Sequence, residues 1–403
     1  MKKARDNKPH IGIFGRRNTG KSSLINTLVG QEIAIVSDQA GTTTDPVKKS
    51  IEIFGMGPAI IVDTAGIDDI GQLGQKRIEK TLEALKIVDC AVIMISDNKF
   101  DSFEIDLIKE FNYWRIPFLI IHNKSDEGAL EESTIAKIHE TTRVPIFPFS
   151  TINPVNLTHI IEELKKIIPE SVFQQPSLLG DIIGKGDYVL LITPIDNEAP
   201  DGRMILPQVM AIRDVLDNDA INIVLKEDQV ENFFKKSGIT PKLAITDSQV
   251  FEKMKNIVPA NVPFTSFSIM LSRFRGDFEA YLEGTPKIDD LKDGDRVLIL
   301  ESCSHQVNCD DIGRFKLPKW IKEYSGKNIE FDIVAGLDKI TRNMEEYQLV
   351  IQCGGCMVTR KQLWNRLRPA KDAYVAISNY GMTIAWVNGI FERVTEPFRA
   401  VYV

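Results

Sequence analysis

Residues 15–22 combine glycine, lysine and hydroxyl side chains at a spacing that suits the binding of a phosphate group. They read Gly-Arg-Arg-Asn-Thr-Gly-Lys-Ser, which fits the pattern G-x-x-x-x-G-K-S/T between a strand and a helix. The glycines let backbone N–H groups wrap a phosphate, Lys21 is expected to reach the β- and γ-phosphates, and the Ser22 hydroxyl to ligate Mg²⁺. The predicted nucleotide contacts in this loop are Gly15, Asn18, Thr19, Gly20, Lys21, Ser22 and Ser23.

Asp63-Thr-Ala-Gly66, at the end of another apolar run, is expected to complete the phosphate site. Asp63 is predicted to hold Mg²⁺ through water, and the Gly66 N–H to contact the γ-phosphate. Residues 41–46, between the two motifs, resemble a segment of the translation-factor-related GTPases, and that alignment makes Thr43 a second Mg²⁺ ligand. An ordinary surface turn is the alternative interpretation of this segment.

A third motif, Asn123-Lys124-Ser-Asp126, follows an apolar strand and predicts which base is bound. The Asp126 carboxylate can accept two N–H bonds from the edge of guanine, and adenine does not offer that pattern. A site built on buried hydrogen bonds rejects an analogue that leaves them unpaired, so the motif predicts GTP over ATP. Ser150 and Thr151 follow the next strand and are predicted to pack on the base.

Two residues bear on how fast the bound nucleotide is hydrolysed. Ile67 stands where many GTPases place a glutamine that orients the attacking water, so slow intrinsic hydrolysis is predicted. Asn18 resembles the asparagine that helps to coordinate the ion in K⁺-activated GTPases; the alternative is that it only shapes the loop. Catalysis is assigned to Lys21, Thr43 and Gly66, with K⁺ as the activator.

Cysteines far from these motifs suggest a second site of a different kind. Cys303-Ser-His305 comes directly after one predicted strand, and Cys353-Gly-Gly-Cys356 comes after another. Because residues just past parallel strands gather at one edge of a sheet, these side chains are expected to meet there. A structural Zn²⁺ on all four residues, a redox dithiol at Cys353 and Cys356, and a [4Fe–4S] cluster on three cysteines all remain open.

The elements that must position these residues alternate between strand and helix over the first 170 residues, which predicts a mostly parallel sheet with helices on both faces. Residues 169–181 contain two prolines and no clear period, so they are predicted to be a linker. Two further α/β regions follow. Among their predicted strands are residues 188–192, 220–225, 296–301, 329–334 and 349–352.

The bulk composition narrows the classes of protein that fit. A chain of 403 residues with 43% hydrophobic and 26% charged residues suits two or three globular domains. A net charge of −7 argues against a general nucleic-acid binder. No apolar run has the length of a membrane span or a secretory signal, so we expect a cytoplasmic protein without a membrane partner.

Taken together, the motifs resemble those of the maturation GTPases of [FeFe]-hydrogenases, the HydF family. The likeness rests on the GTPase motifs, on Cys303-Ser-His305 with the following Asp310-Asp311-Ile-Gly-Arg314, on the run from Cys353 to Trp364, and on Asn379-Tyr-Gly-Met382. It implies an α/β protein of three domains. These are a P-loop GTPase domain with a parallel sheet at residues 1–170, a dimerisation domain at 178–265 and an iron–sulfur cluster-binding domain at 266–403.

The resemblance also implies cofactors and a role. It places a [4Fe–4S] cluster on Cys303, Cys353 and Cys356, beside GTP or GDP, Mg²⁺ and K⁺ at the nucleotide site. It implies a homodimeric scaffold that receives a di-iron precursor from radical-SAM maturation enzymes and delivers it to the hydrogenase apoprotein, without nucleic acid. The alternative function is that of a ribosome- or tRNA-associated GTPase with a structural zinc site.

The sequence departs from that family at one position next to the cysteines. Family members commonly carry histidine before the C-x-x-C motif, and this chain carries Gln352. An amide is a poor iron ligand, so the fourth cluster ligand is left to His305, to water or to a carboxylate such as Glu301.

Overall fold

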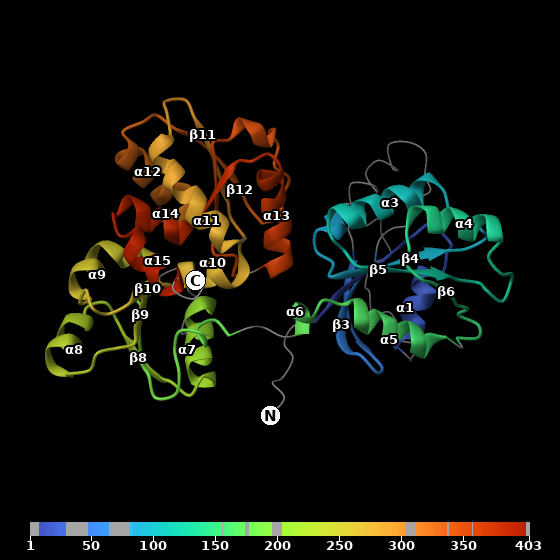
Figure 1. The fold of residues 1–403 in the computed structure, drawn as a ribbon, viewed down its shortest axis with the longest axis horizontal. Helices are drawn as coiled ribbons and strands as arrows, with labels where there is room; N and C mark the ends of the chain where they lie inside the picture. Colours follow the sequence, from blue (N-terminus) through green and yellow to red (C-terminus); the bar gives the residue numbers. More distant parts are fainter. Residues whose placement is uncertain are drawn as a thin grey trace. The chain divides into compact units, whose positions relative to one another are not determined.

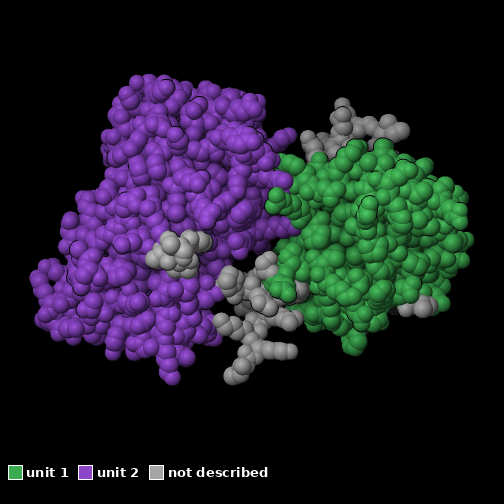
Figure 2. Space-filling model, viewed as in Figure 1, with its two compact units in different colours: residues 1–175 green, residues 176–403 purple. Residues whose placement is uncertain are grey.

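A computed structural model describes the chain at residues 8–29, 47–63, 81, 83–154, 156–173, 177–195, 204–302, 311–336, 338–356 and 358–399; of Val47, Asp63, Ser171 and Phe173 only the backbone is described. The chain divides into two compact units, residues 1–175 and 176–403 (Figure 2). The boundary falls within residues 169–181.

The first unit is built on a six-stranded sheet in the order β2-β3-β1-β4-β5-β6 (Figure 1). Its strands are β1 (His10–Gly15), β2 (Val47–Ile53), β3 (Gly57–Asp63), β4 (Cys90–Ile95), β5 (Phe118–His122) and β6 (Ile146–Pro148). β2 pairs antiparallel with β3, and the other neighbouring pairs are parallel. The prediction of a mostly parallel sheet is therefore confirmed.

Helices cover both faces of this sheet over two separate apolar cores. They are α1 (Lys21–Val29), α3 (Ser102–Tyr113), α4 (Glu132–Thr141) and α5 (Leu157–Ile167), and a short α6 (Glu170–Phe173) follows. Buried residues of α1 and α5 join one core, and those of α3 and α4 join the other. Along β4, Val92 and Met94 belong to the first core while Ile93 and Ile95 belong to the second. Successive strand side chains point to opposite faces, so a strand covered on both sides is continuously apolar.

The second unit contains two four-stranded sheets, β10-β9-β7-β8 and β12-β11-β13-β14, in which all neighbouring strands are parallel. The strands are β7 (Tyr188–Ile192), β8 (Ile221–Leu225), β9 (Leu243–Thr246), β10 (Phe264–Ser266), β11 (Arg296–Leu300), β12 (Glu330–Val334), β13 (Leu349–Gln352) and β14 (Ala376–Asn379). In each sheet the first strand in the chain lies between the second and the third. The two sheets therefore share one topology.

One apolar core joins the two sheets of this unit, since residues of both belong to a single buried cluster. The helices around it are α7 (Leu206–Asp217), α8 (Val230–Lys236), α9 (Phe251–Ile257), α10 (Phe267–Arg275), α11 (Phe278–Gly284), α12 (Leu317–Ser325), α13 (Arg360–Asp372), α14 (Tyr380–Val387) and α15 (Phe391–Arg399). Short turns of helix lie at η1 (Ser248–Val250), η2 (Thr285–Asp290), η3 (Ile312–Lys316) and η4 (Met344–Glu346). None of the described helices is both long enough and apolar enough to cross a bilayer.

Candidate functional site

The predicted phosphate loop connects the end of β1 to the start of α1. Gly15 and Gly20 have φ values of +147° and +91°, which side-chain-bearing residues rarely adopt, and Asn18 has a φ of 63°. A Cβ at Gly20 would lie 2.0 Å from Nδ2 of Asn123, so the loop also approaches the guanine motif too closely for any side chain. The turn brings the chain round to the N-terminal end of α1, where backbone N–H groups have no partner within the helix and can bind an anion.

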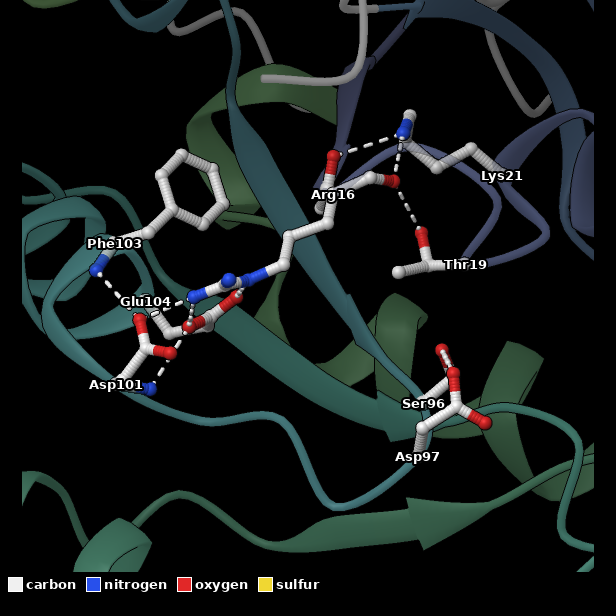
Figure 3. Close-up of polar contacts among 9 residues, drawn as sticks. Arg16, Thr19, Lys21, Ser96, Asp97, Asp101, Phe103 and Glu104 are labelled. Carbon is white, nitrogen blue, oxygen red and sulfur yellow. Dashed lines mark hydrogen bonds and ion pairs between the residues drawn. The ribbon is translucent and has the colours of Figure 1, made fainter. Parts of the chain in front are cut away.

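Lys21 bends back over the loop to which it belongs. Its Nζ donates to the carbonyl oxygens of Gly15 and Arg16 at 2.8 and 2.6 Å, and the residue is only 8% exposed (Figure 3). The Thr19 hydroxyl donates to the same Arg16 oxygen at 2.9 Å. The ammonium group is thus held inside the loop, where a phosphate would be wrapped. Ser22 and Ser23 are exposed at the start of α1.

Arg16 points away from Lys21, toward the N-terminal end of α3 (Figure 3). Its Nε and Nη2 donate to the two oxygens of Glu104 at 2.8 and 3.0 Å, and Nη2 also donates to Asp101. Glu104 is 1% exposed, and the two acidic residues form the capping box of α3. Hydrogen bonding to Glu104 raises the pKa of Arg16 above its ordinary value. The sequence reasoning missed this ion pair, which ties the phosphate loop to α3.

The guanine motif follows β5 and contacts the phosphate loop directly. Asn123 Nδ2 donates to the carbonyl oxygen of Thr19 at 2.8 Å. Asn123 Oδ1 is buried and accepts no hydrogen bond from any described residue. Lys124 has a φ of 60°, and Asp126 is exposed. The motif therefore presents an unpaired buried acceptor and an exposed carboxylate, as a site for a hydrogen-bonding base requires.

The loop after β6 is tied to the guanine motif through the backbone. The Ser125 N–H donates to the carbonyl oxygen of Phe149 at 3.1 Å. Ser150, which follows, is buried, and its hydroxyl accepts the N–H groups of residues 152 and 153 at 3.1 and 3.3 Å. Thr151 is partly buried. The structure thus brings the predicted base-packing residues beside the motif that they were expected to assist.

Several predicted residues are not placed by the structure. Asp63 is the last residue of β3, and only its backbone is described. Thr43, Gly66, Ile67, Cys303 and His305 lie outside the described residues.

Cys353 and Cys356 follow β13, next to the carboxyl end of β11. The two strands pair in parallel, and the Cys353 N–H donates to the carbonyl oxygen of Leu300 at 3.0 Å. β12, the next strand in the chain, lies on one side of β11, and the later strand β13 lies on its other side. The direction in which strands are added to the sheet therefore reverses between β11 and β13. Ligands of open parallel sheets bind at this reversal, beyond the carboxyl ends.

The Cys353 thiol lies among hydrogen-bond donors. The Ser302 N–H donates to its sulfur at 3.0 Å, and Nε2 of Gln352 lies 3.5 Å from the same atom. Burial raises the pKa of Cys353, while hydrogen bonds from Ser302 and Gly355 act in the opposite direction. Cys353 and Cys356 are both in the thiol form. Donors aimed at sulfur suit a thiolate that binds a metal or an iron–sulfur cluster.

Unpaired polar atoms around this thiol indicate that another group fits there. The buried atoms Gln352 Oε1 and Tyr380 OH have no hydrogen-bond partner among the described residues. Burial, followed by the charge of Cys353, raises the pKa of Tyr281 and of Tyr380 above their ordinary values. Buried polar groups in proteins are nearly always paired, so these atoms fit a site that takes a bound group. Among the residues that the structure describes, no group of three or more His, Cys, Asp or Glu side chains could hold a metal ion, at this site or at any other.

Two arginines hold the backbone on either side of the cysteines. Arg275, from α10, donates to three carbonyl oxygens of the turn after Cys353. Arg366, from α13, donates to the carbonyl oxygens of Glu301 and Val334, at the ends of β11 and β12. Burial lowers the pKa of both arginines from the ordinary value. The sequence reasoning missed both, because a backbone acceptor has no signature in a sequence.

Glu301, considered above as a fourth cluster ligand, is paired with Arg314. Arg314 Nε lies 3.2 and 3.1 Å from the two carboxylate oxygens, and Nη2 lies 2.9 Å from one of them. Hydrogen bonding to Glu301 raises the pKa of Arg314.

A phosphate loop on a β1–α1 turn, joined to an Asn-Lys-Ser-Asp motif after β5, defines the first unit as a P-loop GTPase domain. Comparison with protein families agrees: residues 10–124 match the family described as 50S ribosome-binding GTPase. Residues 178–276 match the hydrogen maturase F dimerization domain, and residues 279–397 match the hydrogen maturase F tetramerization domain. The chain belongs to the hydrogen maturase F (HydF) family.

Curated relatives are GTPases with other names. The tRNA modification GTPase MnmE of Lachnoclostridium phytofermentans is 30% identical over 241 residues, which are 53% of this chain and 50% of that protein. The GTPase Der of Nitratiruptor sp. is 28% identical over 220 residues, or 54% of this chain and 47% of that protein. The chain thus spans about half the length of the curated relatives it matches. Among solved structures, Aquifex aeolicus Era bound to GDP·AlF₄⁻ is similar at 21% identity, over 55% of this chain and 93% of that chain, with a TM-score of 0.35.

Proposed function

We propose that this chain is a GTP-hydrolysing scaffold that binds a [4Fe–4S] cluster and carries a di-iron precursor to an [FeFe]-hydrogenase apoprotein. The observation that carries the proposal is the turn of Cys353 and Cys356 at the reversal point of a parallel sheet. This turn occurs in a chain of the hydrogen maturase F family. Radical-SAM maturation enzymes are the proposed source of the precursor.

In this proposal Cys303, Cys353 and Cys356 hold the cluster. Three cysteines leave one iron without a protein thiolate, and that iron can bind an exchangeable ligand. The Gln352 side chain is fully buried, and its Nε2 donates to the Ser302 hydroxyl at 2.9 Å. Gln352 is therefore oriented as a hydrogen-bond donor beside the cysteines, and the open iron is left to His305 or to an exogenous group. An exchangeable ligand suits a protein that must release its cargo.

At the nucleotide site we assign positions to the motif residues. Lys21 contacts the β- and γ-phosphates, Ser22 and Thr43 ligate Mg²⁺, Asp63 holds it through water, and Gly66 contacts the γ-phosphate. When bound, Mg²⁺ neutralises charge that develops on the phosphate oxygens. Asn18 is exposed in the loop, where it can reach a second cation.

With Ile67 in place of a water-orienting glutamine, hydrolysis is proposed to be slow and stimulated by K⁺. Comparing GTPase rates in KCl and in NaCl tests this assignment. A higher rate in KCl supports it, and equal rates contradict it.

Self-association is proposed to use the exposed edge of the first sheet in the second unit. β8 is an edge strand, and Ile221 and Val224 on it are 43% and 42% exposed. Leu206, Val209 and Leu216 on the neighbouring α7 are 43%, 47% and 56% exposed. An unpaired edge beside exposed apolar side chains favours pairing with a second copy. All five residues lie within the segment that matches the dimerization domain.

Anaerobic reconstitution with iron and sulfide, followed by electron paramagnetic resonance (EPR) of the reduced protein, tests the cluster assignment. We expect a [4Fe–4S] signal from the wild type and from Cys90→Ser, because Cys90 is buried in the core of the GTPase unit. We expect Cys353→Ala to lose the signal. Tight zinc binding without iron uptake would contradict the proposal and favour a GTPase with a structural zinc site.

A further inference from the structure

Arg275 is the last residue of α10, and its side chain contacts the turn that holds Cys353 and Cys356. Its Nη1 lies 2.6, 2.9 and 2.8 Å from the carbonyl oxygens of Gly355, Cys356 and Val358. We propose that Arg275 is a positioning residue for the cluster, which holds the turn of residues 353–356 in the shape that brings both thiols to iron. The inference rests on the proposed cluster function.

The geometry of the peptide bond explains how a contact to carbonyl oxygens can arrange sulfur atoms. In a planar trans peptide the C=O and the N–H point in opposite directions. When Arg275 attracts the Gly355 carbonyl, the Cys356 N–H of the same peptide unit must face away from the arginine. Holding the Gly355 carbonyl oxygen on the side of Arg275 therefore turns the Cys356 N–H to the opposite side. A backbone N–H that faces the sulfur atoms of a cluster can donate to them.

Helix α13 also packs closely against the turn and restricts its conformation. Gly355 has a φ of 68°, and a Cβ there would lie 2.3 Å from Cδ1 of Leu363 on α13. The turn is thus confined between α13 and the guanidinium of Arg275. Without the arginine, the carbonyl oxygens would lose their donors while the contact with α13 remained. The turn would then be free to rotate its peptides, and the thiols would no longer be fixed.

The charge of Arg275 acts in the same direction as its hydrogen bonds. A guanidinium remains protonated in proteins and cannot be removed by a pH change in the physiological range. Three thiolates on a [4Fe–4S] core give a site of net negative charge, and a fixed cation beside Cys356 offsets part of it. Arg275 therefore favours the thiolate that metal binding requires.

The arginine also links two segments that the family comparison separates. Arg275 belongs to the dimerization segment, residues 178–276, whereas the turn belongs to the segment at 279–397. α10 packs against α7 and α14 (Figure 1), and Nη2 of Arg275 lies 3.9 Å from Sδ of Met210 on α7. The conformation of the cysteine turn therefore depends on how α10 packs against α7 and α14.

Three variants of the full chain test the proposal, together with a matched control. Arg275→Met removes the donors and the charge but keeps an apolar stem, and Arg275→Lys keeps the charge without the planar fork. Arg393→Met is the control, because Arg393 likewise donates to three carbonyl oxygens, those of Lys255, Val258 and Pro259, at 2.8–2.9 Å. Cys353→Ala marks the loss of the cluster itself.

Two measurements are made on each variant. In the metal-free chain, hydrogen exchange reports how well the amides of residues 353–358 are protected. After anaerobic reconstitution, the bleaching of cluster absorbance by an iron chelator reports retention.

The expected result is a loss specific to Arg275→Met. Changes to groups that orient metal ligands typically cost 10–100-fold in metal affinity, so we expect about 10-fold faster cluster loss or more. Exchange in the turn should rise in the same variant, Arg275→Lys should fall between it and the wild type, and Arg393→Met should retain its cluster. The proposal is overturned if Arg275→Met and Arg393→Met lose the cluster equally fast, or if neither differs from the wild type. If the wild type takes up no more iron than Cys353→Ala, the proposed cluster function fails, and this inference fails with it.

Discussion

Replacement of Gly20 by alanine tests how closely the phosphate loop and the guanine motif depend on each other. Two costs can be separated in the structure. Gly20 has a φ of 91°, and an alanine in such a left-handed conformation costs about 1–2 kcal/mol. The new Cβ would also lie 2.0 Å from Asn123 Nδ2, so Asn123 must move and its hydrogen bond to Thr19 is lost. A typical hydrogen bond contributes about 0.5–1.5 kcal/mol, which gives a total of about 1.5–3.5 kcal/mol.

Gly55 provides the control for the first of these costs. Its φ is 83°, and a Cβ there would meet nothing within 4 Å. The thermal transition that GDP shifts belongs to the first unit, because a ligand stabilises only the part that binds it. For a unit of this size 1 kcal/mol corresponds to about 2–4 °C, so Gly55→Ala should lower that transition by about 2–8 °C and Gly20→Ala by about 3–14 °C, the larger fall of the two.

Adding Asn123→Ala separates the two mechanisms further. If Gly20→Ala already breaks the contact between Asn123 and Thr19, the second substitution should add little to the first. The affinity for a fluorescent GDP analogue should fall with Gly20→Ala and stay unchanged with Gly55→Ala. The reasoning is refuted if Gly20→Ala and Asn123→Ala have fully additive effects on stability, or if Gly20→Ala costs no more than Gly55→Ala.

Three further predictions concern other contacts. Arg16→Ala leaves the buried carboxylate of Glu104 without its cation; breaking a buried pair costs about 3–5 kcal/mol, and we expect the lower end because Arg16 is 23% exposed. The GDP-sensitive transition measures this loss, and an effect no larger than that of Arg17→Ala would contradict it. Val224→Lys on β8 should shift the chain toward monomer in light scattering coupled to size exclusion, and an unchanged mass would exclude β8 from the interface. Burial lowers the pKa of His122 below the unfolded value near 6.5, so the unfolded state takes up the proton first and the first unit should lose stability as the pH falls below about 6.5. Thermal scans from pH 8 to pH 5 should show this fall weakened in His122→Gln, and identical profiles would contradict it.

The central strands could be predicted because their signal is local. Residues 90–95 and 118–121 are apolar throughout, and all of them are buried in β4 and β5. The predicted strand at 188–192 has the same bounds as β7, and that at 349–352 has the same bounds as β13. Motifs of the nucleotide site are equally local, since each occupies a few consecutive residues at the end of one strand.

Three of the edge strands, β2, β10 and β14, were not among the strands predicted from the sequence, whereas the edge strands β8 and β12 were. β2 carries Lys48 and Lys49, β10 has only three residues, and β14 ends in Ser378 and Asn379. Edge strands are short or polar because an exposed apolar edge would pair with other chains, so their apolar pattern is weak. The shared topology of the two sheets in the second unit was also invisible, because strand order is set by the crossover connections and not by residue type.

The contacts that complete each site could not be predicted from spacing. Arg275 lies 80 residues from Gly355, and Arg16 lies 88 residues from Glu104. A carbonyl acceptor is present at every residue, so a sequence does not distinguish the ones that an arginine will reach. Burial of Glu104 likewise depends on how α3 packs, which follows from the whole unit and not from its own sequence.

The most direct test of the central claim is activation of an [FeFe]-hydrogenase apoprotein by this chain. The chain is isolated anaerobically after coexpression with radical-SAM maturation enzymes and added to the apoprotein, and hydrogen evolution is measured. We predict that the wild type restores hydrogen evolution and that Cys353→Ala, at equal protein and with normal GTP binding, does not. Equal activation by the two proteins, or none by the wild type when it carries its cluster, would contradict a role as a cluster-dependent carrier.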